Sequence, residues 1–146
     1  MQIHQLLAIG AIAALSWGLP AVAQHAKGAD QEFFFTRGIY SDTGNDNWGG
    51  RWAVDYPKAD LQFLVALRRL STVHAFDSDN ALELDSPRLR KYPFLYILEV
   101  GSMKLSDSEV TALRDYIQAG GFMVVDDFWG TWAWQNFEKE MKRVFP

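Results

Sequence analysis

Two kinds of apolar pattern alternate along the chain, and their order predicts the secondary structure. Short apolar runs without polar alternation are typical of strands covered on both faces. Such runs lie at 33–35, 94–98 and 122–125, with shorter strand-like pieces at 72–76 and 81–84. Apolar residues three or four positions apart predict helices over about 57–71, after Ser106, and from 134 to 144. The resulting order of strands and helices predicts an α/β fold of three layers, in which helices cover both faces of a mostly parallel sheet.

The best-defined of these elements is the helix after Ser106, together with the strand that follows it. Ser106 and Glu109 have the spacing of a capping box, in which each side chain accepts a hydrogen bond from the backbone amide of the other residue. Gly120 and Gly121 supply the left-handed backbone with which helices commonly end. The strand at 122–125 then leads into a loop that begins with two adjacent aspartates. Ligands usually bind at the carboxyl ends of strands in open α/β sheets, so this loop is the first candidate site.

Composition and charge narrow the class of protein. The chain has 146 residues, 49% of them hydrophobic, and a formal net charge of −4. These values suit one globular domain and provide no basic surface, so nucleic acid is not an expected partner. The chain has no cysteine, which excludes disulfides, thiolate metal sites and a cysteine nucleophile.

The amino-terminal segment predicts export. Residues 1–23 contain no Asp, Glu, Lys or Arg and end in the sequence A-V-A, after a long apolar stretch. This pattern is typical of a secretory signal peptide cleaved before Gln24, and an uncleaved membrane anchor is the alternative. We therefore expect a periplasmic or extracellular protein that contacts a membrane only if this segment stays uncleaved. The expected organisation is a signal peptide at 1–23, a flexible lead-in at 24–31 and a single α/β domain at 32–146.

Three carboxylates are candidates for catalysis. Asp126 and Asp127 follow one predicted strand and Glu99 follows another, so parallel strands would bring them to the same edge of the sheet. Glu99 and Asp127 would then form an acid/base pair of the kind that hydrolyses glycosides. The same oxygens, with Asp55, suit Mg²⁺ or Ca²⁺, but neither a metal nor a cofactor is predicted on this ground alone. The structural alternative is that one aspartate caps the following helix near Thr131.

A second group of candidates lies in the long loop predicted at 36–57. Arginine binds carboxylate or phosphate groups and aromatic rings stack on ligands, so its side chains suit a ligand pocket. The predicted ligand-binding residues are Arg37, Tyr40, Trp52, Asp55 and Tyr56, together with Asp127 and Trp129 after the last strand. The pocket interpretation expects Asp126 or Asp127 in one concave site with Arg37 or Asp55. The alternative is an Arg37–Asp55 ion pair, with aromatic residues that fix the loop to the core.

A third interpretation makes the domain an interaction subunit of a membrane-associated complex. It expects an exposed aromatic patch instead of a cleft. The residues available for such a patch are Trp48, Trp52, Trp129 and Trp132.

Four blocks of the sequence resemble a known bacterial family. They are RGIY at 37–40, WAVDYPKAD at 52–60, KYPFLY at 91–96 and LRDYIQAGGFMVVDDFWG at 113–130. Together they look like the bacterial domain of unknown function 4159. The resemblance implies a three-layer fold similar to that of class I glutamine amidotransferases, which is flavodoxin-like in outline. Members of the family continue beyond the point that corresponds to Pro146, so the resemblance also implies a domain that is incomplete at its carboxyl end.

The resemblance does not carry an activity over to this chain. In the amidotransferases that the family resembles, the catalytic cysteine lies on a sharp turn after a strand. The corresponding stretch here, 124–130, has carboxylates near that position, so cysteine-dependent glutaminase activity is not expected. We instead expect an exported domain that binds a small polar ligand, an envelope polymer or an envelope protein at the carboxyl edge of its sheet. The alternative is a hydrolase that uses carboxylate or metal-assisted chemistry at Asp126, Asp127 and Glu99.

Overall fold

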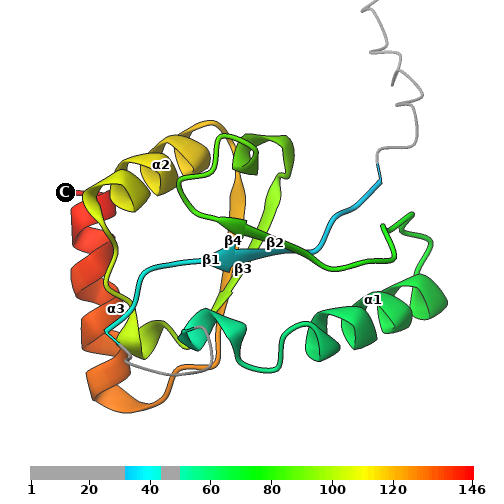
Figure 1. Ribbon diagram of the computed structural model, residues 1–146, viewed down its shortest axis with the longest axis horizontal. Helices are drawn as coiled ribbons and strands as arrows, with labels where there is room; N and C mark the ends of the chain where they lie inside the picture. The colour runs from blue at the N-terminus through cyan, green and yellow to red at the C-terminus, as the bar shows by residue number, and fades with distance from the viewer. Residues whose placement is uncertain (1–31, 44–49) are drawn as a thin grey trace, which may run out of the picture.

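The computed structural model describes residues 32–43 and 50–146 of the chain (Figure 1). The segments 1–23 and 24–31, to which the sequence assigns a signal peptide and a lead-in, lie outside the described residues. The described residues form one all-parallel sheet of four strands in the order β2-β1-β3-β4. The strands are β1 (Thr36–Ile39), β2 (Asn80–Glu83), β3 (Phe94–Leu98) and β4 (Phe122–Asp126). The α-helices are α1 (Lys58–Leu70), α2 (Asp107–Gln118) and α3 (Gly130–Val144), and the 3-10 helices are η1 (Arg51–Ala53), η2 (Leu89–Lys91) and η3 (Val100–Ser102).

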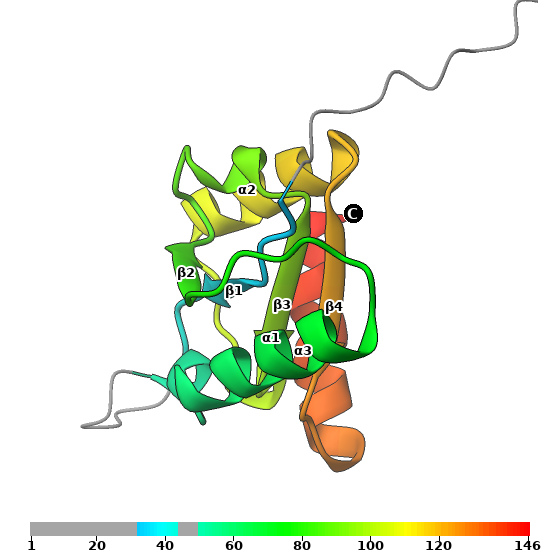
Figure 2. The same cartoon turned by 90° about the vertical axis from the view of Figure 1, so that its right-hand side faces the viewer.

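The elements stack in three layers. Helix α1 lies on one face of the sheet, and α2 and α3 lie on the other (Figure 2). The predicted α/β class and parallel sheet are therefore confirmed at the level of the architecture. No helix in the described part of the chain combines the length and the apolar character needed to cross a bilayer.

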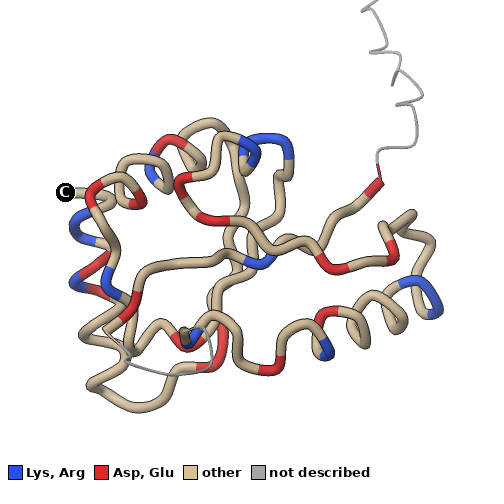
Figure 3. Tube along the Cα trace, in the orientation of Figure 1, with Lys and Arg blue, Asp and Glu red and all other residues tan. Residues whose placement is uncertain are grey.

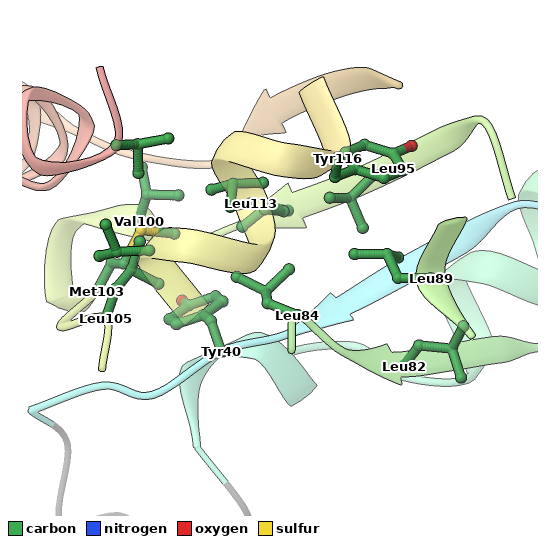
Figure 4. Close-up of a cluster of buried hydrophobic side chains, with 13 residues drawn as sticks. Tyr40, Leu82, Leu84, Leu89, Leu95, Val100, Met103, Leu105, Leu113 and Tyr116 are labelled. Atoms are coloured by element: carbon green, nitrogen blue, oxygen red, sulfur yellow. The ribbon is translucent and has the colours of Figure 1, made fainter. Parts of the chain in front are cut away.

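Alternation along β3 divides the core between the two faces. Leu95 and Ile97 belong to the larger cluster of buried side chains, and Leu95 lies there beside Leu113 and Tyr116 of α2 (Figure 4). Phe94 and Tyr96 point the other way and pack on the smaller cluster under α1, which contains Phe35, Leu64 and Ala75. Neighbouring residues of a strand point to opposite faces, so one short apolar run fills both cores.

The helix before β4 forms as the sequence predicts. The Ser106 hydroxyl accepts a hydrogen bond from the Glu109 amide at 3.2 Å, and the Glu109 carboxylate accepts one from the Ser106 amide at 2.7 Å. Gly120 has a φ of 95°, which a side chain would disfavour. The capping box and the glycine therefore fix both ends of α2, and the turn after α2 delivers the chain to β4 at the amino edge of the sheet.

The first strand begins later than predicted. The run at 33–35 makes only an isolated bridge from Phe33 to Ala75, whereas β1 is the following segment TRGI. A Cβ atom on Gly38 would lie within 3.2 Å of side chains from the larger core. The strand passes so close to that core that a larger side chain here would have to displace its neighbours. The glycine interrupts the apolar pattern, so the sequence does not reveal the strand. The aromatic run instead packs its rings under α1, where Phe35 contacts Tyr96.

Strand β4 also departs from its prediction. Its side chains are not covered on both faces, because Phe122 is 63% exposed and 123–125 are half-buried. Among the described residues β4 pairs with β3 alone, so it forms one edge of the sheet. The apolar run predicts a strand correctly, but it does not reveal the position of the strand in the sheet.

Candidate functional site

A hollow of about 350 Å³ opens at the carboxyl edge of the sheet. Its walls come from Arg37 on β1, Asp55 and Ala59 around the start of α1, Tyr96 and Leu98 on β3, and 125–129 at the end of β4. We call it the carboxyl-edge hollow. Parallel strands all end at the same edge, so segments far apart in the sequence meet there. The structure thus brings the Asp126–Asp127 pair together with Arg37 and Asp55, as the pocket interpretation expects.

The wall formed by β1 is held together by a buried ion pair. Arg37 and Asp60 are each 1% exposed, and the Arg37 Nε donates to the two Asp60 carboxylate oxygens at 3.1 and 3.0 Å. The Nη2 of Arg37 makes a further short contact with Asp60 Oδ1. Its Nη1 donates to the carbonyl oxygens of Trp52 and Val54 at 3.0 and 2.9 Å. The expected Arg37–Asp55 ion pair is therefore wrong, because the partner is Asp60 in the first turn of α1.

Two aromatic rings enclose the Arg37 guanidinium. Its central carbon lies 5.6 Å from the centre of the Tyr56 ring and 5.4 Å from that of the Tyr96 ring. Such contacts favour a cation in a buried position. With the ion pair and the two carbonyl contacts, they tie the segment before α1 to the sheet. Arg37 lines the hollow, but its charge is already compensated by Asp60.

The wall formed by the end of β4 has the opposite character. Asp126 is exposed, and its carboxylate accepts hydrogen bonds from the Tyr96 hydroxyl at 2.9 Å and from the Asp127 amide at 2.7 Å. The Asp127 carboxylate accepts a hydrogen bond from the indole Nε1 of Trp129 at 2.9 Å. Trp129 itself is 80% exposed. These carboxylates are oriented by uncharged donors, and none of the ion pairs in the described part of the chain includes them.

The backbone at this edge is locally unusual. Asp55, Glu99 and Asp127 have φ values of 58°, 53° and 52°, in the left-handed region that non-glycine residues seldom adopt. The Glu99 amide lies 3.2 Å from the carbonyl oxygens of both Asp126 and Asp127, which links the ends of β3 and β4. Two of the three left-handed residues line the hollow. Unusual backbone conformations gather at binding sites, and they support a functional role for this edge.

Several predicted site residues instead support the fold. Tyr40 is 4% exposed, and its hydroxyl donates to the carbonyl oxygens of Leu98 and Glu99 at 2.8 and 3.1 Å. Trp52 is half-buried against the larger core and offers its carbonyl to Arg37. Tyr56 packs on Arg37, and its hydroxyl contacts Asp79. None of these residues borders the hollow, so the arrangement agrees with the alternative in which aromatic side chains fix the loop.

The catalytic candidates are not assembled in one place. Glu99 does not border the hollow that contains Asp126 and Asp127. Among the described residues, no group of three His, Cys, Asp or Glu side chains could hold a metal ion. The predicted helix cap is wrong as well, because Trp129 is the N-cap of α3 and no side chain caps that end. Capping therefore does not explain the positions of Asp126 and Asp127.

Tyr96 is a site residue that the sequence analysis did not identify. Burial, followed by the hydrogen bond to the Asp126 carboxylate, raises its pKa to about 12. Burial and the contact with Asp79 raise the pKa of Tyr56 to about 12 in the same way. Both phenols are therefore protonated donors at neutral pH. The apolar run around Tyr96 indicated a core strand, and only the register with β4 places its hydroxyl beside Asp126.

The predicted aromatic patch is described only in part. Trp129 and Trp132 are 80% and 69% exposed, Trp52 is half-buried, and Trp48 lies outside the described residues. Trp129 borders the hollow, whereas Trp134 stacks on Phe128 with ring centres 6.1 Å apart. Of the exposed tryptophans near the start of α3, Trp129 is the one that the described walls of the hollow include.

Comparison with known proteins identifies the family. No curated protein matches the chain significantly. Residues 39–146 match the family described as domain of unknown function (DUF4159), which covers most of the described residues. Because the match includes more than half of the chain, the protein belongs to the DUF4159 family.

Proposed function

We propose that the domain binds a small polar ligand in the carboxyl-edge hollow, and that this ligand presents hydroxyl or ammonium groups as hydrogen-bond donors. The observation that carries the proposal is the convergence of Asp55, Asp126 and Asp127 on one concave site beside Trp129. An ionised carboxylate accepts hydrogen bonds but cannot donate them. A ligand that donates hydrogen bonds is therefore complementary to these walls.

The charge of the hollow supports this ligand class. Arg37 is the one basic residue among the described walls of the hollow, and the buried Asp60 carboxylate neutralises it. Three aspartates remain at the surface of the hollow, so the field inside it is negative and disfavours anionic ligands. The role first expected for Arg37, binding a carboxylate or phosphate, is for this reason not part of the proposal.

The volume of the hollow and its aromatic wall favour a small ligand over an envelope polymer. The volume of about 350 Å³ lies within the range of small-molecule sites. Trp129 offers an exposed indole whose Nε1–H is already held by Asp127. A ring fixed in this way can stack on the apolar face of a sugar or lie against an ammonium group. The hydrolase alternative receives less support, because Glu99 lies outside the hollow.

Thermal unfolding in the presence of defined probes tests the proposal. Glucosamine, glucose and putrescine carry the expected donors, and inorganic phosphate and citrate serve as anionic controls. A ligand that binds only the folded state raises the melting temperature in proportion to its occupancy. We expect a rise with at least one of the three donor probes and no rise with phosphate or citrate.

Matched variants connect any response to the hollow. Asp126→Asn combined with Asp127→Asn removes two charges and keeps the shape of the wall, so the rise should disappear. Asp77→Asn removes one exposed carboxylate outside the hollow and should leave it unchanged. The proposal fails if the donor probes bind equally well to the double variant, or if only the anions bind.

Export is part of the proposal, and its support is the sequence of residues 1–23. If the segment is a cleaved signal peptide, the exported protein begins at Gln24. Amino-terminal sequencing of the protein recovered from the periplasm or the medium tests this directly. Recovery of the whole chain from the membrane fraction would instead favour an uncleaved anchor.

A further inference from the structure

We propose that the segment 99–103, none of whose residues is among the described walls of the carboxyl-edge hollow, sets the position of the β4 wall, so that Gly101 and Asn136 are positioning residues for ligand binding. The proposal rests on the proposed function, because the wall concerned contains Asp127 and Trp129. It is supported by one contact at the end of β4 and two contacts near the start of α3.

The connection between β4 and α3 is short. β4 ends at Asp126 and α3 begins at Gly130, so only 127–129 join them. All the residues of this connection line the hollow. A chain segment of this length has little slack, and Trp129 directly precedes the helix. Any displacement of α3 therefore moves Trp129 as well.

The first contact holds the start of this connection. The amide of Glu99, which directly precedes η3, lies 3.2 Å from the carbonyl oxygens of both Asp126 and Asp127. β3 and β4 are paired up to Leu98 and Asp126, so the contact continues their pairing beyond the two strands. The backbone of Asp127 is thereby fixed relative to η3.

The second contact is a close approach between η3 and α3. Gly101 and Ala133 are both buried where these two elements pack together. A Cβ atom on Gly101 would lie 2.8 Å from the Cβ and 3.3 Å from the Cα of Ala133. Non-bonded carbon atoms prefer separations of about 3.5 to 4.0 Å, so a methyl group at this position would force η3 and α3 apart. Gly101 therefore determines how closely α3 approaches η3.

The third contact comes from Asn136, which fixes the same approach by hydrogen bonds. Its Nδ2 donates to the carbonyl oxygens of Val100 and Met103 at 3.2 and 2.8 Å. Val100 and Met103 are buried, so removal of this donor would cost more than the loss of an exposed hydrogen bond. Asn136 lies three positions after Ala133, and residues at this spacing share one face of a helix. The two residues thus present the same face of α3 to η3.

These contacts use no charged side chain, since Glu99 takes part through its backbone amide. η3 has the sequence VGS, and α3 contains no Asp, Glu, Lys or Arg from 130 to 137 (Figure 3). The field inside the hollow depends on charges that a substitution in η3 or in this part of α3 leaves in place. A change in ligand binding caused by such a substitution therefore reports on the position of the wall.

Gly101→Ala tests the positioning, and the indole N–H of Trp129 reports it without a ligand. This group donates to Asp127, so its nuclear magnetic resonance signal responds to the position of both residues. We expect Gly101→Ala to shift the signal. Adding Ala133→Gly should return it most of the way, because the second substitution removes the methyl group that collides. Glucosamine, glucose or putrescine, whichever the unmodified protein binds, should bind about tenfold more weakly to Gly101→Ala and regain affinity in the double variant.

Gly121→Ala is the matched control. A Cβ atom on Gly121 would overlap the ring of Tyr116, so this substitution disturbs packing severely at the other end of β4. We expect it to lower the melting temperature without shifting the Trp129 signal or weakening the binding of the donor probe. An unmoved Trp129 signal in Gly101→Ala would overturn the proposal, and so would equal effects of the two glycine substitutions on that signal.

Asn136→Ala tests the same contact without adding atoms, and it decides the question if Gly101→Ala does not fold. The substitution removes the donor to two carbonyl groups, so the Trp129 signal should shift and the donor probe should bind more weakly. Asn80→Ala is its control, because the Asn80 amide donates to the Thr36 hydroxyl at 2.8 Å on the β2 side of the sheet. A Trp129 signal that moves equally in both variants, or in neither, would contradict the positioning role.

The two readouts distinguish a failure of this proposal from a failure of the proposed function. If no donor probe binds to the unmodified protein, the proposed function fails, and the Trp129 signal still decides whether η3 positions the wall. If a donor probe binds equally well to the unmodified protein, to Gly101→Ala and to Asn136→Ala, the hollow binds its ligand without this positioning. That result would leave the proposed function intact and overturn the role of Gly101 and Asn136.

Discussion

The two sides of the carboxyl-edge hollow both depend on aspartates, but the aspartates have opposite surroundings. On the β1 side, the charges of Arg37 and Asp60 are buried and paired with each other. On the β4 side, Asp126 and Asp127 are held by hydrogen bonds from uncharged donors. The difference shows that the role of a charged residue depends on how completely its neighbours satisfy it. The charges of the first wall fix the local conformation, and the carboxylates of the second wall remain available to a ligand.

The buried pair has a clear structural task. Arg37 joins three segments that are distant in the sequence, because it contacts Asp60 on α1, the carbonyls of Trp52 and Val54, and the ring of Tyr96 on β3. Burial of an ion pair costs much of the energy that its attraction returns, so such pairs contribute more to defining a conformation than to net stability. Here the conformation defined is that of the segment carrying Asp55.

The largest expected effect is the loss of the buried partner on the β1 side. Asp60→Asn leaves the Arg37 guanidinium buried without a countercharge and should lower the free energy of unfolding by about 3 to 5 kcal/mol. Urea unfolding measures this change. Asp55→Asn is the control on the same wall, because Asp55 is exposed and asparagine tolerates its left-handed backbone. Equal effects of the two substitutions would contradict the division between buried and available carboxylates.

Alkaline pH should weaken the contact between the walls at Tyr96. The folded pKa values of Tyr56 and Tyr96, about 12, are raised above the ordinary value of 10.0. Their contribution to stability is therefore complete below pH 10 and is lost as the pH rises through about 12. Urea unfolding at a series of alkaline pH values should show this decline, and a double Tyr56→Phe and Tyr96→Phe variant should show a shallower one. An unchanged slope would contradict the assignment to these two phenols.

A smaller effect is expected for Tyr96→Phe at neutral pH. The substitution removes the hydroxyl that donates to Asp126 but keeps the ring beneath Arg37. The hydrogen bond is exposed, so we expect the free energy of unfolding to fall by only about 0.5 kcal/mol. Binding of a donor probe should weaken in addition, since Asp126 loses a group that orients it. A loss of stability as large as that of Asp60→Asn would show that Tyr96 supports the fold in the same way as the buried Arg37–Asp60 pair.

The smallest effects on stability are expected on the β4 side. Asp127→Asn alters a half-buried side chain and Trp129→Ala an exposed one, and each should change the free energy of unfolding by no more than about 0.5 kcal/mol. Both should nevertheless reduce binding of a donor probe, which calorimetric titration measures. If either substitution destabilises the fold strongly and leaves binding intact, the β4 side supports the fold and does not bind the ligand, which contradicts the proposal.

Local signals in the sequence predicted much of this arrangement. The capping box at Ser106, the apolar run at 94–98 and the glycines after α2 all report on contacts within a few residues, and the structure confirms each of them. Parallel strands also made it possible to predict that Asp126 and Asp127 lie near Arg37. The family could likewise be identified from the sequence.

The remaining features depend on contacts that no local pattern contains. Asp60 was missed because its partner Arg37 is 23 residues away in the sequence, and Asp55 stands closer to the same loop. Gly38 interrupts the apolar pattern where β1 passes the core, so the first strand was placed too early. Glu99 follows its strand as predicted, but its side chain is not among the walls of the hollow. In each case packing between distant segments decided the outcome.

The most direct test of the central claim compares the two walls in one nuclear magnetic resonance titration. The indole N–H of Trp129, which donates to Asp127, reports on the β4 side, and the Nε–H of Arg37, which donates to Asp60, reports on the β1 side. The variants Trp129→Phe and Arg37→Lys would assign the two signals. With glucosamine as the probe, the signal of Trp129 should move to saturation while that of Arg37 stays in place. Movement of the Arg37 signal alone, or of neither signal while glucosamine binds, would contradict a ligand site built on the exposed wall.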